Sequence, residues 1–116
     1  MAVLVLCSAT GSPGVTTTAL GLALGWPRDV LLADCDRDPS QAVQAGYLRG
    51  MDHGGRGLMA LAQVHREGAA LATEVWRQAL PLTSGEDTRR RFLPGFASAG
   101  ASRLFEHVWG ALGEAF

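Results

Sequence analysis

Near the start of the chain, a glycine turn followed by hydroxyl side chains has the residue types that bind phosphate. It reads Thr10, Gly11, Ser12, Pro13, Gly14, Val15, Thr16, Thr17, Thr18. Backbone amides of a glycine-rich turn that opens a helix form a cradle for an anion, and the helix dipole strengthens it. A plainer interpretation of the same residues is a strand-to-helix turn, in which the threonine hydroxyls cap the first amides of the helix.

The turn differs from the standard phosphate-binding loop at the position that carries the positive charge. That loop reads glycine, any four residues, glycine, lysine, and then serine or threonine. Aligned on Gly14, the chain matches at Gly14 and Thr16 but differs at Ala9 and at Val15, which stands in place of lysine. All ten basic residues are arginine, and none precedes Arg28. Because the lysine offsets charge on the β- and γ-phosphates, its loss is expected to weaken binding and to slow phosphoryl transfer more.

The turn lies between two apolar runs. Residues 1–9 lack the alternation of a half-exposed strand, which predicts a buried strand in a parallel sheet covered on both faces. Residues 16–26 have apolar positions at helical spacing. Residues 29–33 contain a second apolar run, Val30 to Ala33, which ends in an acidic cluster. Strand, helix and strand in this order predict a βαβ unit with a right-handed crossover.

The rest of the chain is predicted to continue the α/β pattern as a single domain over residues 1–116. A glycine-rich loop is predicted at 50–57 and a polar turn at 83–87. A short strand at 91–93 is ended by Pro94 and Gly95. The spacing of apolar residues predicts helices over residues 39–48, 58–67, 71–80 and 102–116.

The first third of the chain resembles the MinD/ParA family of P-loop ATPases. The family carries a deviant loop, K-G-G-x-G-K-T-T, and a second strand that ends in D-x-D-P. This chain has Gly11, Gly14, three successive threonines, and an acidic cluster of Asp34, Asp36 and Asp38 ahead of Pro39. It looks most like the degenerate branch, the CpaE/TadZ-like proteins and the actinobacterial MinD-like proteins, where loop lysines are often lost. The resemblance covers residues 1–41 and implies an incomplete P-loop NTPase fold, a parallel sheet flanked by helices, of which this chain is the N-terminal half.

The resemblance also implies a role for each matching position. The amides of the loop would wrap the phosphates of ATP, Thr16 would bind Mg²⁺ through its hydroxyl, and Thr17 would contact the α-phosphate. Asp36, or Asp34 in a shifted register, would lie near the metal or the attacking water as the catalytic carboxylate. The nucleotide-binding residues are then Gly11, Ser12, Pro13, Gly14, Val15, Thr16 and Thr17, with Thr16 and Asp36 on Mg²⁺.

The sequence departs from the family pattern in two respects. Thr10 and Val15 stand where the family has its two lysines, and Arg37 and Asp38 are extra residues before Pro39. The aspartate with the metal-side role is therefore open. A solvated strand end followed by a helix cap is the plainer interpretation of the cluster.

Three functions follow as hypotheses. The first is an ATP-binding protein that positions or regulates a larger assembly, as a homodimer or with a protein partner, with hydrolysis slow unless a partner supplies an arginine. The second is a protein-interaction module that descends from a P-loop protein but binds no nucleotide. The third is a dinucleotide-binding fragment, because Asp34 lies twenty residues past Gly14, near the ribose-binding spacing. Against the third, Thr17 occupies the last glycine position and no lysine exists for a catalytic tyrosine–lysine pair.

Composition and charge exclude further classes of function. Apolar residues make up 47% and the net charge is −1, which gives no basic field for nucleic acid. No apolar run is long enough to span a bilayer, and a cytoplasmic protein is expected.

The cysteines and the arginine run receive structural interpretations. Cys7 and Cys35 are predicted to be buried free thiols, and the arginines at 89–91 are predicted to form a solvated strand edge. The three histidines, His53, His65 and His107, have no ligand spacing, so no structural metal is predicted.

Overall fold

The structure is a computed structural model that describes residues 3–8, 14–36, 43, 47–48, 56–83, 88–96, 101, 103 and 105–116. Helices and strands follow one another along these residues in a mixed α/β order. They are α1 (Val15–Gly25), β1 (Val30–Ala33), α2 (Leu58–Arg66), α3 (Leu71–Arg77), β2 (Leu80–Pro81), β3 (Arg90–Leu93) and α4 (Trp109–Ala115).

The described strands form one three-stranded sheet in the order β1-β3-β2. β1 pairs with β3 in parallel, with Val30 opposite Arg90 and Ala33 opposite Leu93. β2 is antiparallel to β3, and its Pro81 is tolerated because β2 is an edge strand. The predicted parallel pairing therefore holds for β1 and β3 but not for β2, and the P-loop fold itself stays a prediction.

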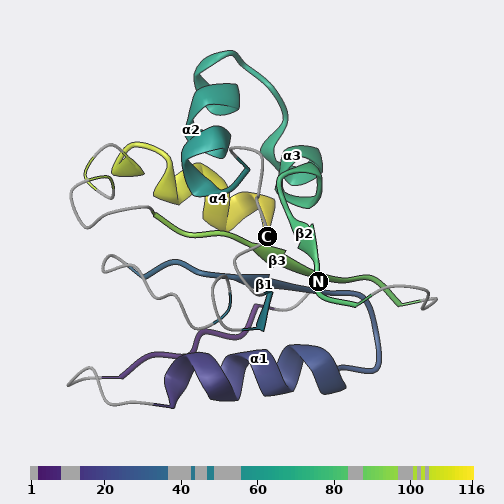
Figure 1. Cartoon of the computed structure of the whole chain (residues 1–116). Helices are drawn as coiled ribbons and strands as arrows, with labels where there is room; N and C mark the ends of the chain where they lie inside the picture. Colours follow the sequence, from purple (N-terminus) through teal and green to yellow (C-terminus); the bar gives the residue numbers. More distant parts are fainter. Residues whose placement is uncertain are drawn as a thin grey trace.

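Helices cover both faces of this sheet (Figure 1). α2, α3 and α4 lie on one face, and α1 lies on the other. Side chains of β1 alternate between the two layers, because successive residues of a strand point to opposite faces. Leu31 and Ala33 pack against the first layer, while Val30 and Leu32 pack against the second. This double coverage explains why all four residues of β1 are apolar.

The two layers form separate hydrophobic clusters. The cluster under α2, α3 and α4 is made of Leu58, Leu61, Ala62, Leu71, Val75, Leu93, Phe96, Phe105, Val108 and Leu112. The cluster on the other face is made of Ala23, Val43, Leu48, Leu80, Leu82 and Phe92. α1 therefore contributes a single buried residue, Ala23.

Predicted and observed elements agree best where helical periodicity or a turn marks the boundary. The helices predicted at 16–26 and 58–67 are confirmed as α1 and α2, and the strand at 91–93 as part of β3. The helix predicted at 71–80 ends at Arg77, because Leu80 pairs with Phe92 in the sheet. The predicted final helix is regular only from Trp109. The helix at 39–48, the loop at 50–57 and the turn at 83–87 lie largely outside the described residues.

The buried strand predicted for residues 1–9 is wrong for the part that the structure describes. Residues 3–8 contain no strand. Val3 is 55% exposed, Leu4 66% and Val5 83%. An apolar run becomes a buried strand only when a neighbouring strand pairs with it and both faces are covered. Apolar composition alone cannot show that these partners exist.

Candidate functional site

The N-terminus of α1 begins after a glycine in the left-handed region and has no side-chain cap. Gly14 precedes the helix with φ 105° and ψ −16°, in the left-handed region, and no side chain caps this end. A residue other than glycine would be strained at this φ. The carbonyl of Gly14 accepts a hydrogen bond from the amide of Thr18 at 2.8 Å, which starts the helix. The first amides of α1 therefore lack a capping side chain, and they are the groups that an anion would bind.

The side chains at this helix end are partly accessible. Val15 and Thr16 are half-buried, whereas Thr17 is exposed. The other predicted loop residues, Gly11, Ser12 and Pro13, lie outside the described residues.

The acidic end of β1 lies directly beside the end of β3. The amide of Asp34 donates to the carbonyl of Leu93 at 3.1 Å, which extends the parallel pairing by one residue. The amide of Asp36 then donates to Oδ1 of Asp34 at 3.2 Å. A Cβ atom on Gly95 would lie 2.7 Å from the carbonyl oxygen of Asp34 and 2.9 Å from its Cγ. Glycine is therefore required at position 95 for the chain after β3 to pass Asp34.

This environment raises the pKa of two side chains at the end of β1, those of Asp34 and Cys35. Desolvation raises the pKa of Asp34, partly opposed by the hydrogen bond from the Asp36 amide, and the charge of Asp36 raises it further. Desolvation of the thiol, with the charges of Asp34 and Asp36, raises the pKa of Cys35 to about 11. The Cys35 thiol is therefore protonated at neutral pH and is a poor nucleophile. Both cysteines are free, as predicted. Each residue as a whole is exposed, although the Cys35 thiol itself is desolvated, so the predicted burial of the two residues is wrong.

The described parts of the two predicted clusters, the N-terminus of α1 and the end of β1, lie at one edge of the fold. α1 runs opposite to β1, and its N-terminus lies on the same side as the carboxyl ends of β1 and β3 (Figure 1). In open α/β sheets, ligands bind at this edge. Among the described residues, no hydrogen bond joins Thr16 to Asp34 or Asp36. Asp38 lies outside them, and the described residues include no group of three or more histidine, cysteine, aspartate or glutamate side chains that could hold a metal ion.

The arginines at 89–91 bind other elements. Arg89 is exposed, as a solvated strand edge predicts, but Arg90 and Arg91 are half-buried, which corrects that prediction for these two. The amide and Nε of Arg89 donate to the carboxylate of Asp29 at 2.7 and 3.1 Å, and its guanidinium lies 4.5 Å from the ring centre of Trp76. Arg90 donates to the carbonyl of Trp26, and Arg91 to that of Ala79. These arginines therefore hold β3 to the segments around it.

Sequence reasoning missed a basic pocket on the opposite face of the sheet. It is lined by Ala62, His65, Arg66, Arg103, His107 and Val108. The histidines appeared unrelated in the sequence, because His65 and His107 lie far apart along the chain. The spacing of four residues between Arg103 and His107 was the available signal, since such pairs lie on one side of a helical segment.

In the part of the chain that the structure describes, no helix is long and apolar enough to cross a membrane. Comparisons of the whole chain with protein-family models, curated proteins and solved structures give no match, so the site's geometry and the sequence pattern carry the functional argument.

Proposed function

We propose that this chain binds the phosphates of a nucleotide at the N-terminus of α1, with ATP as the ligand that the sequence pattern favours. The supporting observation is the uncapped helix end at Gly14, placed at the edge where the parallel strands β1 and β3 end. Helix amides and the dipole favour an anion there without any lysine. A nucleotide site of this kind also fits the glycine turn of residues 11–14.

Individual residues take distinct roles in this proposal. The amides of Gly14, Val15 and Thr17 bind phosphate oxygens, and the hydroxyl of Thr16 is a ligand for Mg²⁺. Asp36 is the more accessible of the two described carboxylates at the end of β1, and it serves the hydrated cation. Bound Mg²⁺ supplies positive charge that offsets the phosphates.

The expected rate of ATP hydrolysis depends on Val15. It supplies no charge where a P-loop lysine would contact the β- and γ-phosphates, so the transition state of phosphoryl transfer lacks a main stabilising group. We therefore expect binding with slow or absent hydrolysis, and turnover only when a partner supplies an arginine. Such a protein serves as a nucleotide-dependent switch that positions or regulates a larger cytoplasmic assembly, as a homodimer or with a protein partner.

Calorimetric titration with Mg-ATP tests this function, with NAD⁺ as the competing ligand. Saturable binding of ATP supports it, and preferential binding of NAD⁺ supports a dinucleotide site instead. Gly14→Ala adds a Cβ to a residue in the left-handed region, which strains the backbone at the start of α1. It is expected to weaken ATP binding about tenfold or more. Gly21→Ala is the matched control, because Gly21 lies in the same helix with nothing within 4 Å of an added Cβ.

A gain-of-function variant makes the test sharper. Val15→Lys restores the missing charge and is expected to tighten Mg-ATP binding about tenfold, because one lysine contact to phosphate is charge-assisted. Absence of saturable ATP binding in both the natural chain and Val15→Lys, with both proteins folded, contradicts the proposal.

An interaction module is the second candidate, and one observation favours it. The apolar side chains of Val3, Leu4, Val5 and Leu6 are exposed, between 43% and 83%. A run of exposed apolar residues is typical of a surface that binds another protein. Val5→Asp is expected to weaken self-association or partner binding in sedimentation experiments, while ATP titration of the same variant stays unchanged.

A further inference from the structure

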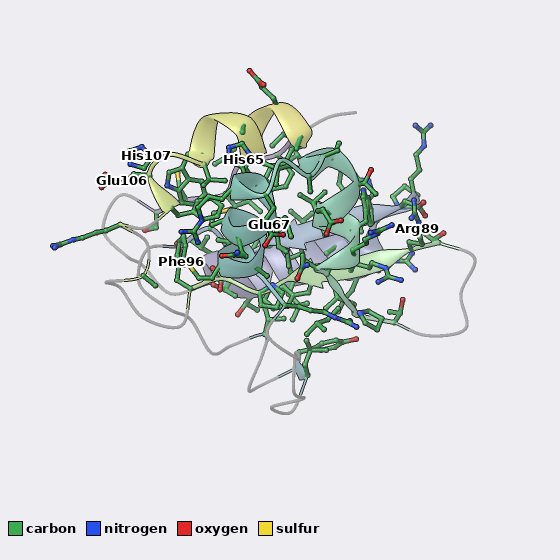
Figure 2. All side chains as sticks on the ribbon, turned by 90° about the horizontal axis from the view of Figure 1, so that it is seen from above. His65, Glu67, Arg89, Phe96, Glu106 and His107 are labelled. Atoms are coloured by element: carbon green, nitrogen blue, oxygen red, sulfur yellow. The ribbon has the colours of Figure 1, made fainter. Side chains whose placement is uncertain are left out.

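A pocket of about 520 Å³ lies between the end of α2 and the segment that leads into α4. α2 contributes Ala62, His65 and Arg66, and the segment before α4 contributes Arg103, His107 and Val108. Figure 2 shows His65 and His107 in the same part of the molecule, with Arg89 on the other side of the view. Ala62 and Val108 are 3% and 4% exposed, so they form an apolar floor under four basic side chains. The volume is that of a small-molecule site.

Among the described residues, no carboxylate lines this pocket. Arg66 donates through Nη2 to Oε1 of Gln63 at 3.1 Å, and this partner is neutral. Among the described residues, ion pairs join Arg77 to Glu74 and Arg89 to Asp29, and neither involves Arg66 or Arg103. Glu67 accepts a hydrogen bond from Gln63 instead, and Glu106 lies beside His107 without lining the pocket (Figure 2).

The helix dipole explains only part of this arrangement. His65 and Arg66 lie in the last turn of α2, where positive charge stabilises a helix C-terminus. Arg103 and His107 belong to the segment before α4, so the end of α2 gives no reason for them. Two elements that are distant in the sequence therefore bring their basic side chains to one pocket.

We infer that this pocket binds a small molecule that carries a phosphate monoester. Two guanidinium groups match the charge of a phosphate dianion, and their planar donors can each bind two of its oxygens. Two imidazoles add further donors, and the apolar floor accepts the carbon part of the ligand. A metal ion does not fit the same pocket, because the guanidinium groups repel a cation and two histidines fall short of the ligands that a zinc site needs.

The pocket is independent of the proposed nucleotide site. It lies in the layer of α2 and α4, on the opposite face of the sheet from α1 (Figure 1). Substitutions at Gly14 or Val15 are therefore expected to leave phosphate binding in this pocket unchanged. The two sites can be tested in the same full-length chain.

Titration with inorganic phosphate, followed by amide NMR shifts, tests the inference. Phosphate is expected to shift the amides at the end of α2 and at residues 105–108, with acetate at equal ionic strength as the control ligand. Arg103→Gln and Arg66→Gln are each expected to weaken phosphate binding about tenfold, because each removes a charge-assisted contact. Arg77→Gln is the matched control, an exposed arginine in the last turn of α3 that does not line the pocket, and it is expected to leave binding within about twofold.

Each possible result either supports or overturns the inference of a phosphate-binding pocket. A loss of affinity in Arg103→Gln and Arg66→Gln, with Arg77→Gln unchanged, supports the pocket. Shifts confined to the first turn of α1, or no saturable binding, overturn it. If Arg103→Gln does not fold, His107→Gln at an exposed position replaces it, and unchanged phosphate affinity in both Arg66→Gln and His107→Gln also overturns the inference.

Discussion

The two faces of the sheet are packed to different degrees. Among the residues that the structure describes, the face under α2, α3 and α4 has ten buried residues in its cluster, whereas the α1 face has six, of which α1 supplies only Ala23. Leu22 of α1 is 42% exposed. Because buried apolar area is the main stabilising contribution in folding, the first face is expected to hold the fold together. The proposed nucleotide site lies at the end of the less packed face, where a change of structure on binding costs less.

The largest expected difference between the faces comes from truncating the aromatic core. Phe105 is completely buried, and its ring meets those of Phe96 and Trp109 edge-to-face with centres 5.6 and 4.7 Å away. Phe105→Ala is expected to lower the free energy of unfolding by about 3–5 kcal/mol. Leu22→Ala, on the other face, is expected to lower it by less than about 1 kcal/mol. Urea denaturation followed by circular dichroism measures both, and equal losses would show that the faces contribute alike.

A smaller effect is expected where the ends of β1 and β3 meet. Gly95→Ala places a Cβ 2.7 Å from the carbonyl oxygen of Asp34, and backbone must move to relieve the clash. We expect a loss of about 1–3 kcal/mol in the free energy of unfolding, the usual cost of overpacking. Gly113→Ala is the control, since nothing lies within 4 Å of its added Cβ and alanine favours a helix. A Gly95→Ala protein as stable as Gly113→Ala would show that this edge adapts freely.

On both faces, the elements that could be predicted are those that local periodicity or turn residues mark, as in α1 and α2. Leu58, Leu61 and Ala62 recur at helical spacing and are all buried in α2, because an amphipathic helix must turn that face to the core. Pro94 and Gly95 marked the end of β3 correctly, since they disrupt regular pairing.

Two features could not be predicted because they depend on the tertiary arrangement: the exposure of residues 3–6 and the formation of the basic pocket. Apolar composition favoured a buried strand, yet Val5 is 83% exposed, because burial requires neighbours that local sequence does not specify. The pocket joins His65 to Arg103 and His107 only after α2 and the segment before α4 pack together. The proposed loop site lies between these cases, because its glycine turn can be recognised in the sequence, while its place at the same edge of the fold as the end of β1 depends on the tertiary arrangement.

The smallest effects are expected in the pH dependence of stability, where the two ends of β1 are predicted to differ. At the carboxyl end, desolvation raises the pKa of Asp34 above 3.8. The folded state then holds its proton more tightly than the unfolded state, so stability falls as pH rises through this range. Asp34→Asn keeps an oxygen acceptor for the Asp36 amide and removes the charge. It is expected to raise the melting temperature at neutral pH, with no difference from the natural chain below pH 3.8.

Asp29, just before β1, is expected to show the opposite sign. Hydrogen bonds from the backbone and side chain of Arg89 lower the pKa of Asp29 below 3.8, so its ionised form stabilises the folded state. That stability is complete above pH 3.8 and is lost as pH falls through the lowered value. Asp29→Asn is therefore expected to lower the melting temperature at neutral pH, and the difference from the natural chain disappears in strong acid. Parallel pH profiles for Asp29→Asn and Asp34→Asn would contradict the assignment, because desolvation and a guanidinium partner act on a carboxylate in opposite directions.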